Sequence, residues 1–448
     1  MNNKLLAGFG RADVTPCMGI NLAGYYQIRL ADGVLDPLQT DALALAVGNK
    51  KVLLVSVDHC GLLVKDVTAI KAAITEKTGV PSNSIIISST HTHTGPDTAV
   101  DHKGELERDY FKFLTAKMVD ACTFALNDLK PAVMGWKVGN APNIAFVRRF
   151  RMKDGYVRTN PGVGNPDIAH PLGDVDERVN VLRFDREGGD TIVLMNFGNH
   201  PDVVGGNKIS ADWPGLARTK IEAFLPGVKG MFFNGAEGDV NHVNVNAKDG
   251  DWNDLANDFD DVARGYGHAN HMANVLVGAV LQVYDKVNYI DVDRLDSIEK
   301  VIDVPANKGT PEEMPLAHKY FDLYKAGRQD EIPFKGMELT TVVAEAQRMV
   351  ELENHDDFFK MPIMAVAIGN VGIATMPGEG FTWMGRELKK EEGWDLVLPM
   401  ANANGSECYF PTEDAYIEGG YEARSCPLKQ GNAEFITEEC AKLLRALR

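Results

Sequence analysis

Two histidines separated by one residue, His91 and His93, lie in the segment SSTHTHTGPD at 88–97. The apolar run Ile85–Ile87 before them predicts a buried strand, and the Gly-Pro pair behind them ends it. Because side chains alternate along a strand, both imidazoles are expected to point to the same side. Imidazole is the commonest metal ligand in proteins, and zinc binds it together with two or three further ligands. Taken alone, the motif fits a metal site and a hydrogen-bonded polar loop equally well.

Polar side chains follow three other apolar strands that the sequence predicts. They are His200 after Thr191–Phe197, Asp239 and Asn241 after Lys229–Asn234, and Glu379 after Val371–Met376. If these strands belong to one sheet, their polar ends gather on one rim, where open α/β sheets commonly bind ligands. Two or three histidines with a carboxylate form a catalytic zinc set, and zinc lowers the pKa of bound water to about 7. The set therefore predicts hydrolysis by zinc-activated water.

The elements that would position these residues follow from hydrophobic periodicity. The predicted strands are 42–47 and 51–57, joined by a tight turn, then 85–87, 133–137, 191–197, 229–234 and a hairpin of 364–369 with 371–376. The predicted helices are 63–77, 106–129, 212–224 with Asp212 as N-cap, 263–283, 311–326 and 339–353. This order predicts an α/β fold of mixed sheets flanked by helices, with a zinc site at strand ends and a helical insertion. One domain is expected over 1–448, with 294–357 as an inserted cap.

The charge balance narrows the classes of partner that the chain can bind. The 448 residues include 63 Asp plus Glu against 46 Lys plus Arg, which gives a net charge of -17. Nucleic acid and anionic membrane surfaces are disfavoured, because both require a surface lined by Lys and Arg. The exception is the basic run 143–151, which predicts either a solvated face or a site for a carboxylate or phosphate-like group. The expected partner is a small-molecule or lipid amide, and no oligomeric state is indicated.

The six cysteines are scattered without C-x-x-C spacing, so neither a thiolate zinc site nor a disulfide framework is indicated. One bridge, Cys408 with Cys426, stays open. No apolar run approaches the roughly 20 residues of a membrane span. The chain begins without an apolar leader, and the compartment stays open: secreted or periplasmic if a leader was removed, otherwise cytoplasmic.

Taken together, the motifs resemble the neutral/alkaline non-lysosomal ceramidase family, zinc amidases of sphingolipid metabolism that cleave the N-acyl bond of ceramide. The resemblance rests on STHTHTGP at 89–96, GNHP at 198–201, GDV at 238–240, MPGE at 376–379 and a tyrosine-rich C-terminal stretch. The motifs follow the family order over positions 89–421, so the resemblance covers essentially the whole chain.

The resemblance implies a role for individual residues. The implied zinc ligands are His91, His200, Glu379 and Tyr409. His93 is implied to lie beside the metal, and Tyr421 matches a second active-site tyrosine twelve positions after the first. Arg148 falls at the family's active-site arginine, with Arg149 as the competing assignment. One catalytic Zn²⁺ is implied, and a further structural Mg²⁺ or Ca²⁺ stays open.

Each of these residues also has an ordinary structural interpretation. The histidines are hydrogen-bonded loop residues in that interpretation, Glu379 is a solvated carboxylate, and Tyr409 is a core tyrosine. Asp239 is expected to orient a histidine, and Asp58 is open to the same role. Four further histidines carry no assignment: His59, His242, His268 and His271.

Two departures from the family pattern bear on function. Asn241 stands where ceramidases have a serine implicated in catalysis, and an amide is no nucleophile, so Asn241 at most donates a hydrogen bond. The chain also ends at Arg448 without the family's C-terminal immunoglobulin-like domain. We therefore expect a zinc-dependent amidohydrolase on ceramide or a related linear amide. The alternatives are a zinc esterase, lactonase or deacylase on a soluble substrate, and a non-catalytic metal-stabilised binding protein.

Overall fold

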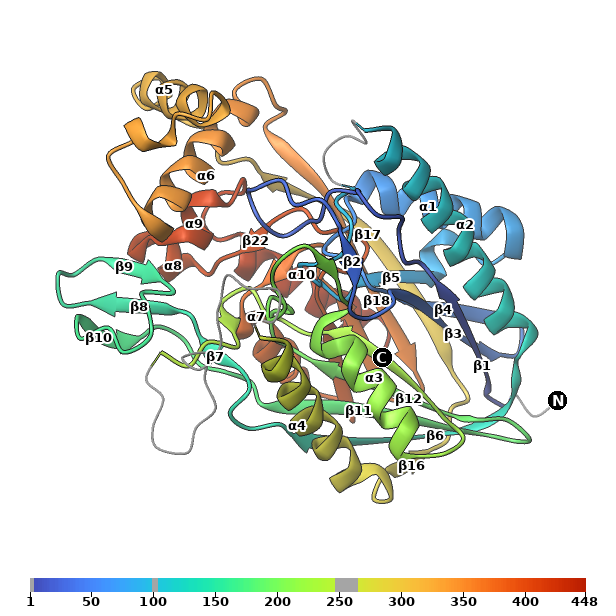
Figure 1. Cartoon of the computed structure of the whole chain (residues 1–448). Coiled ribbons are helices and arrows are strands. Elements are labelled where there is room, and N and C mark those ends of the chain that lie inside the picture. The colour runs from blue at the N-terminus through green and yellow to red at the C-terminus, as the bar shows by residue number, and fades with distance from the viewer. Residues whose placement is uncertain (1–3, 99–103, 246–264) are drawn as a thin grey trace.

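A computed structural model describes residues 4–98, 104–245 and 265–448, and it places two β-sheets at the centre of the molecule (Figure 1). The first sheet has the strand order β14 (Val228–Asn234), β12 (Thr191–Phe197), β11 (Arg178–Arg186), β6 (Lys130–Asn140), β1 (Leu6–Asp13), β3 (Gln39–Val47), β4 (Lys50–Val57) and β5 (Ile85–Ser89), and β16 (Asn288–Ile290) pairs with β6. The second has the order β17 (Leu295–Pro305), β18 (Phe358–Ile368), β19 (Val371–Thr375) and β21 (Leu396–Met400). The predicted α/β class with mixed sheets is confirmed.

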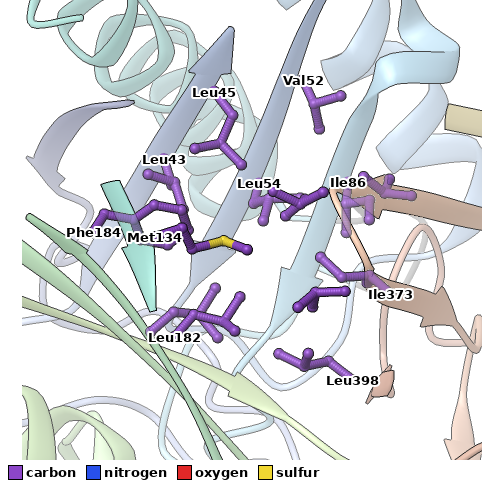
Figure 2. Packing of buried hydrophobic residues seen from close by; sticks show 14 of the residues in the cluster. Leu43, Leu45, Val52, Leu54, Ile86, Met134, Leu182, Phe184, Ile373 and Leu398 are labelled. Atoms are coloured by element: carbon purple, nitrogen blue, oxygen red, sulfur yellow. The ribbon is translucent and has the colours of Figure 1, made fainter. Parts of the chain in front are cut away.

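One hydrophobic core lies between the two sheets. On β3, Leu43 and Leu45 belong to this core, while Ala42 and Ala44 pack in a separate cluster on the helix side of the strand. This is the period of two that a strand imposes. Figure 2 shows Leu54 of β4 and Ile86 of β5 toward Ile373 of the second sheet, and Leu398 belongs to the same cluster, so apolar side chains of both sheets pack together.

Leu398 is a direct probe of this core, because it is fully buried on β21. We expect Leu398→Ala to lower the free energy of unfolding by about 2–5 kcal/mol. The substitution loses the transfer free energy of the removed side-chain atoms and leaves a cavity in their place. Urea unfolding should show a lower midpoint with an unchanged slope. Leu316→Ala serves as the control, because Leu316 is 51% exposed on α5 (Met314–Lys325) and its removal should leave the midpoint in place.

Helices cover the outer faces of the sheets. Helices α1 (Val64–Thr78) and α2 (Glu105–Asn127) cover the β1–β5 half, and α3 (Asp212–Phe224) and α4 (Tyr266–Tyr284) cover the other half (Figure 1). Helices α7 (Thr382–Leu388) and α10 (Asn432–Ala446) cover the second sheet. Gly10 allows α2 to pack closely on β1. A Cβ at this position would lie 2.0 Å from the carbonyl oxygen of Ala121, so a larger residue would not fit.

The first sheet consists of two halves that are barely joined. β1 pairs with β6 only at Leu6–Pro131 and Ala7–Lys130. Farther along, the two halves come together again. Ser56 Oγ on β4 donates a hydrogen bond of 2.6 Å to the carbonyl oxygen of Phe232 on β14. Strands that are far apart in the sheet order therefore lie side by side, and the ends of β5, β12 and β14 meet.

Buried charges fill the space between the halves. Arg218 of α3 is 2% exposed and donates to Asp41 at 3.1 Å and to Asp58. Asp58 also accepts hydrogen bonds from the Gln39 N–H at 2.8 Å and from Thr90 Oγ1 at 3.2 Å. Asp58 thereby ties α3 to the residue before His91, the positioning role that the sequence left open for it.

Small elements complete the molecule. They are β2 (Gly33–Val34) with β13 (Lys208–Ile209), β7 (Phe146–Val147) with β15 (Val240–Asn241), β20 (Glu379–Gly380) with β22 (Tyr409–Phe410), the sheet of β8 (Arg149–Met152), β9 (Val157–Thr159) and β10 (Ile168–Pro171), and helices α5, α6 (Gly336–Leu352), α8 (Glu413–Glu418) and α9 (Tyr421–Ser425). Helices α5 and α6 pack together away from the sheets (Figure 1), whereas β17, also within 294–357, pairs along its whole length with β18.

Most predicted strands and helices are confirmed within a few residues. The N-cap assignment of Asp212 is wrong: Ala211 is the N-cap, and Asp212 is the first helical residue with φ +53°. Its carboxylate instead accepts the N–H groups of Val203 and Val204 at 3.0 and 2.9 Å. The predicted helix 263–283 corresponds to α4, and positions 263–264 lie outside the described residues.

The described residues contain neither a disulfide nor a helix that could span a membrane. All six cysteines are free thiols in this structure, so the Cys408–Cys426 bridge is not formed. Over the ranges that the structure describes, no helix combines the length and apolar content needed to cross a membrane.

Candidate metal centre

Four segments bring the candidate ligands together. His91 follows β5, His200 follows β12, and Glu379 follows β19 at the start of β20. Glu379 pairs with Tyr409 in the parallel β20–β22 ladder, which places these two residues side by side. The expectation of a single sheet is wrong in one respect, since Glu379 comes from the second sheet. The site forms where the rims of both sheets meet.

The ligand atoms of this group converge. Glu379 Oε2 lies 3.4 Å from His91 Nε2 and 3.0 Å from His200 Nε2, and these atoms all lie within 4.8 Å of one another. The opposite ring nitrogens are engaged, because His91 Nδ1 donates to the Cys60 carbonyl at 2.6 Å and His200 Nδ1 to the Glu237 carbonyl at 2.8 Å. Both Nε2 lone pairs therefore face Glu379, as in metal sites whose histidines are oriented through Nδ1.

The Nε2 lone pairs and the Glu379 carboxylate repel one another unless a proton or a cation lies between them. Within the described part of the chain, Glu379 Oε2 is buried without a hydrogen-bond donor. Without an ion, protonation of His91 and His200 offsets the effect of burial and holds the pKa of Glu379 well below its usual range, a role that a bound cation would take over. Two nitrogens and one oxygen at these separations match the edges of a tetrahedral zinc site, which are about 3.3 Å long for bonds of about 2.0 Å. The residues present therefore fit zinc.

The turn after β5, rather than the strand, directs the two histidines. β5 ends at Ser89, and His91 has φ +75°, a left-handed conformation that is uncommon for a bulky residue. The prediction that strand alternation aligns the histidines was wrong for this reason. They still converge, because His91 N–H donates to the His59 carbonyl at 2.9 Å, and the two Nε2 atoms of His91 and His93 are 3.2 Å apart. Backbone strain of this kind often marks functional sites.

Aromatic and cationic groups surround the cluster. The ring of Tyr409 stacks on His200 with centroids 6.3 Å apart, and the ring of Tyr421 meets Tyr409 edge-on at 5.8 Å. Arg148 Nη1 lies 3.3 Å from His200 Nε2, and Arg148 Nε donates to Glu422 at 2.7 Å. Tyr421 shares a 3.0 Å hydrogen bond with the hydroxyl of Tyr26.

The two arginine candidates are separated by the structure. Arg148 Nη2 donates to the Gly238 carbonyl at 2.7 Å, so three fixed contacts hold its guanidinium beside His200. Arg149 instead pairs with Glu418 at 3.2 Å. Arg148 is the arginine that contacts the cluster.

Asn241 and Asp239 have structural partners. Asn241 Nδ2 donates to Asn160 Oδ1 at 2.8 Å, and Asn241 Oδ1 accepts the Val243 N–H at 3.0 Å. Asp239 accepts the N–H and hydroxyl of Thr382 at 2.7 and 2.6 Å, so it anchors the start of α7 just after Glu379. Asp239 thus positions the segment that carries the carboxylate rather than a histidine.

The unassigned histidines lie in other contacts. His59 Nε2 is 3.0 Å from Thr98 Oγ1, and burial lowers the pKa of His59 to about 4. The rings of His242 and His268 meet edge-on with centroids 5.3 Å apart, and His268 and His271 lie 6.2 Å apart on α4.

Several residues of the site carried no clear signal in the sequence. Glu422, Cys60, Asp202 and Arg29 belong to turns or short helices without periodicity. Asp202 Oδ1 lies 3.5 Å from His93 Nδ1, and Arg29 donates to the His93 carbonyl at 2.6 Å. These contacts hold His93 in place, and its pKa is lowered to about 3, mainly by burial.

Comparisons with known proteins place the fold. No family model matches the chain, and no curated protein matches it. Among solved structures, the neutral ceramidase from Pseudomonas aeruginosa has a TM-score of 0.74 at 16% identity, over 100% of this chain and 75% of that one. A ceramidase complexed with C2 has a TM-score of 0.73 at 16% identity, over 99% and 75%. The chain therefore has a ceramidase-like fold.

Proposed function

We propose that this chain is a zinc-dependent hydrolase that cleaves an N-acyl amide bond. The observation that carries the proposal is the convergence of His91, His200 and Glu379, with both Nδ1 atoms tied to carbonyl oxygens, inside a ceramidase-like fold. Tyr409, which pairs with Glu379 in the β20–β22 ladder, is proposed as the fourth ligand. Zinc bound there supplies a Lewis acid for the substrate carbonyl and acidifies the attacking water.

The protein's own groups would handle the charge and the proton. Arg148 is held by Glu422 and the Gly238 carbonyl before any substrate arrives, so its guanidinium is a preorganised donor for the developing oxyanion. Tyr421 offers a second donor on the same side, beside Tyr409. His93 is buried next to His91, and as a neutral imidazole it is proposed to accept a proton from the attacking water and to pass that proton to the leaving amine.

A cavity that meets the proposed catalytic groups only at Tyr421 is proposed to hold the part of the substrate remote from the cleaved bond. It has a volume of about 820 Å³ and is bordered by Thr159, Asn160, α6 and α9. Charged side chains line it, namely Arg158, Lys335, Glu338, Glu418 and Arg424, together with Tyr156, Phe334 and Met337. This mixed lining favours a polar headgroup, so deacylation of a water-soluble amide is the second candidate function.

The test is hydrolysis with and without metal. We expect zinc-loaded protein to release amine from ceramide in detergent or from soluble N-acyl amides, and to lose this activity on chelation and regain it with Zn²⁺. Amine release is measured by fluorescent labelling. Cleavage of soluble amides alone would select the second candidate, and cleavage of esters or lactones alone would contradict amide specificity. Full zinc occupancy with no turnover on any of these would indicate a binding protein.

A further inference from the structure

Cys60 lies beside the metal centre, although the cysteine spacing gave no sign of it. The Cys60 sulfur and one ring nitrogen each of His91 and His93 all lie within 4.8 Å of one another. The carbonyl oxygen of Cys60 also accepts the Nδ1–H of His91 at 2.6 Å, so the same residue touches His91 through its main chain. A thiol and two imidazoles therefore meet on the side of His91 that leads to His93.

The donor set of this trio suits a thiophilic cation, and its atoms lie close enough together for one ion to draw them in. On a tetrahedral ion with bonds of about 2.0 Å to nitrogen and about 2.3 Å to sulfur, neighbouring ligand atoms lie roughly 3.3–3.6 Å apart. The Nε2 atoms of His91 and His93 are 3.2 Å apart. His93 is 8% exposed, and its Nδ1 has no aligned hydrogen bond within the described residues, with Asp202 at 3.5 Å.

We propose that Cys60, His91 and His93 form a second cation position beside the His91–His200–Glu379 position. Because His91 Nε2 has a single lone pair, the two positions are alternatives for one ion. The Cys60 S–H proton leaves to solvent as the sulfur–metal bond forms. The inference rests on His91 being a ligand of the proposed zinc centre.

The two positions differ in their preference for ions. A thiolate favours soft ions such as Cd²⁺, whereas the carboxylate of Glu379 is a harder ligand. Zn²⁺ accepts both ligand types, so it is expected to occupy the Glu379 position when Cys60 is absent. Cd²⁺ is expected to bind through Cys60, away from the carboxylate.

The experiment is a titration of the metal-free chain with Cd²⁺, followed by sulfur-to-cadmium charge-transfer absorbance in the ultraviolet. We expect the absorbance to saturate at one Cd²⁺ per chain. Cys60→Ser should abolish it and weaken Cd²⁺ binding at least about tenfold, because a ligand is lost, while zinc still binds at one per chain. His200→Ala should keep the absorbance, because His200 is not in the trio.

The matched control is Cys122→Ser, since Cys122 is a buried thiol on α2. It should leave the absorbance unchanged. Thermal unfolding of Cys60→Ser and Cys60→Ala guards against misfolding, and either folded variant serves for the test. Absence of Cd²⁺ binding, Cd²⁺ binding without the absorbance, or full absorbance in both Cys60 variants would overturn the proposal. If zinc binds and hydrolysis proceeds while the absorbance is missing, only this inference fails; if no zinc binds, the zinc centre fails as well.

Discussion

Replacing His91 with asparagine is expected to remove the bound metal and to lower kcat/KM by about 10³-fold or more, because a zinc Lewis acid contributes several kcal/mol to the transition state. His91 belongs to both candidate ligand groups, so neither position keeps its full set of ligands in this variant. Asparagine is chosen because it tolerates the left-handed backbone at φ +75°. The fold should therefore survive the change.

Metal content after dialysis, measured by mass spectrometry, is the primary readout. The control is His170→Asn on β10, where the side chain is exposed and distant in sequence from the ligands. This variant should retain both metal and activity. One zinc per chain in His91→Asn, with an unchanged thermal midpoint, would remove His91 from the set of ligands.

Replacing Arg218 with methionine is expected to cost about 3–5 kcal/mol of unfolding free energy, because it leaves the buried carboxylate of Asp58 without its cation. Asp41 keeps its contact with Arg11 at 2.5 Å, but Asp58 loses the side chain that neutralises it. Both aspartates have no exposed surface. The turn that carries Thr90 and His91 should loosen as well.

The penalty of Arg218→Met should depend on pH in a defined direction. Burial raises the pKa of Asp58, and Arg218 opposes this shift. Without Arg218 the folded-state pKa of Asp58 rises further, so the penalty is full above the folded-state pKa of the variant and is lost as pH falls from there toward the lower folded-state pKa of the original chain. Adding Asp58→Asn should restore much of the stability, whereas Arg158→Met, in an exposed pair with Asp154, should leave the midpoint unchanged. Equal midpoints for Arg218→Met and the original chain across the pH range would contradict this account.

Hydrophobic periodicity predicted the longer strands and helices, because each of them packs an apolar face against its neighbours at regular intervals. The alternation of leucine and alanine on β3 follows directly from a strand with the second sheet on one face and a helix on the other. The two-residue strands β20 and β22 were missed, because two residues carry no period. Their pairing is what brings Tyr409 to Glu379, so this part of the site came only from the family resemblance.

The long-range geometry of the site could not be predicted from local patterns. No sequence feature indicated that the two halves of the first sheet would turn toward each other, or that Glu379 would arrive from a second sheet. Arg148 and Arg149 are equivalent in the sequence, and only their contacts separate them: Arg148 contacts His200 and the Gly238 carbonyl, whereas Arg149 pairs with Glu418. Asn241 lies in the expected motif, yet its amide is engaged by Asn160.

The sparse joint between β1 and β6 would give a metal bound at the proposed centre a structural role. His91 extends from one half of the sheet and His200 from the other, while only two residue pairs connect the halves through the ladder. An ion held by both histidines is a cross-link across that seam. An ion that binds only when the two halves are together stabilises the closed arrangement by its binding free energy. We therefore expect metal binding to slow amide hydrogen exchange along β1 and β6, so that the proposed ligands would stabilise the fold as well as support its chemistry.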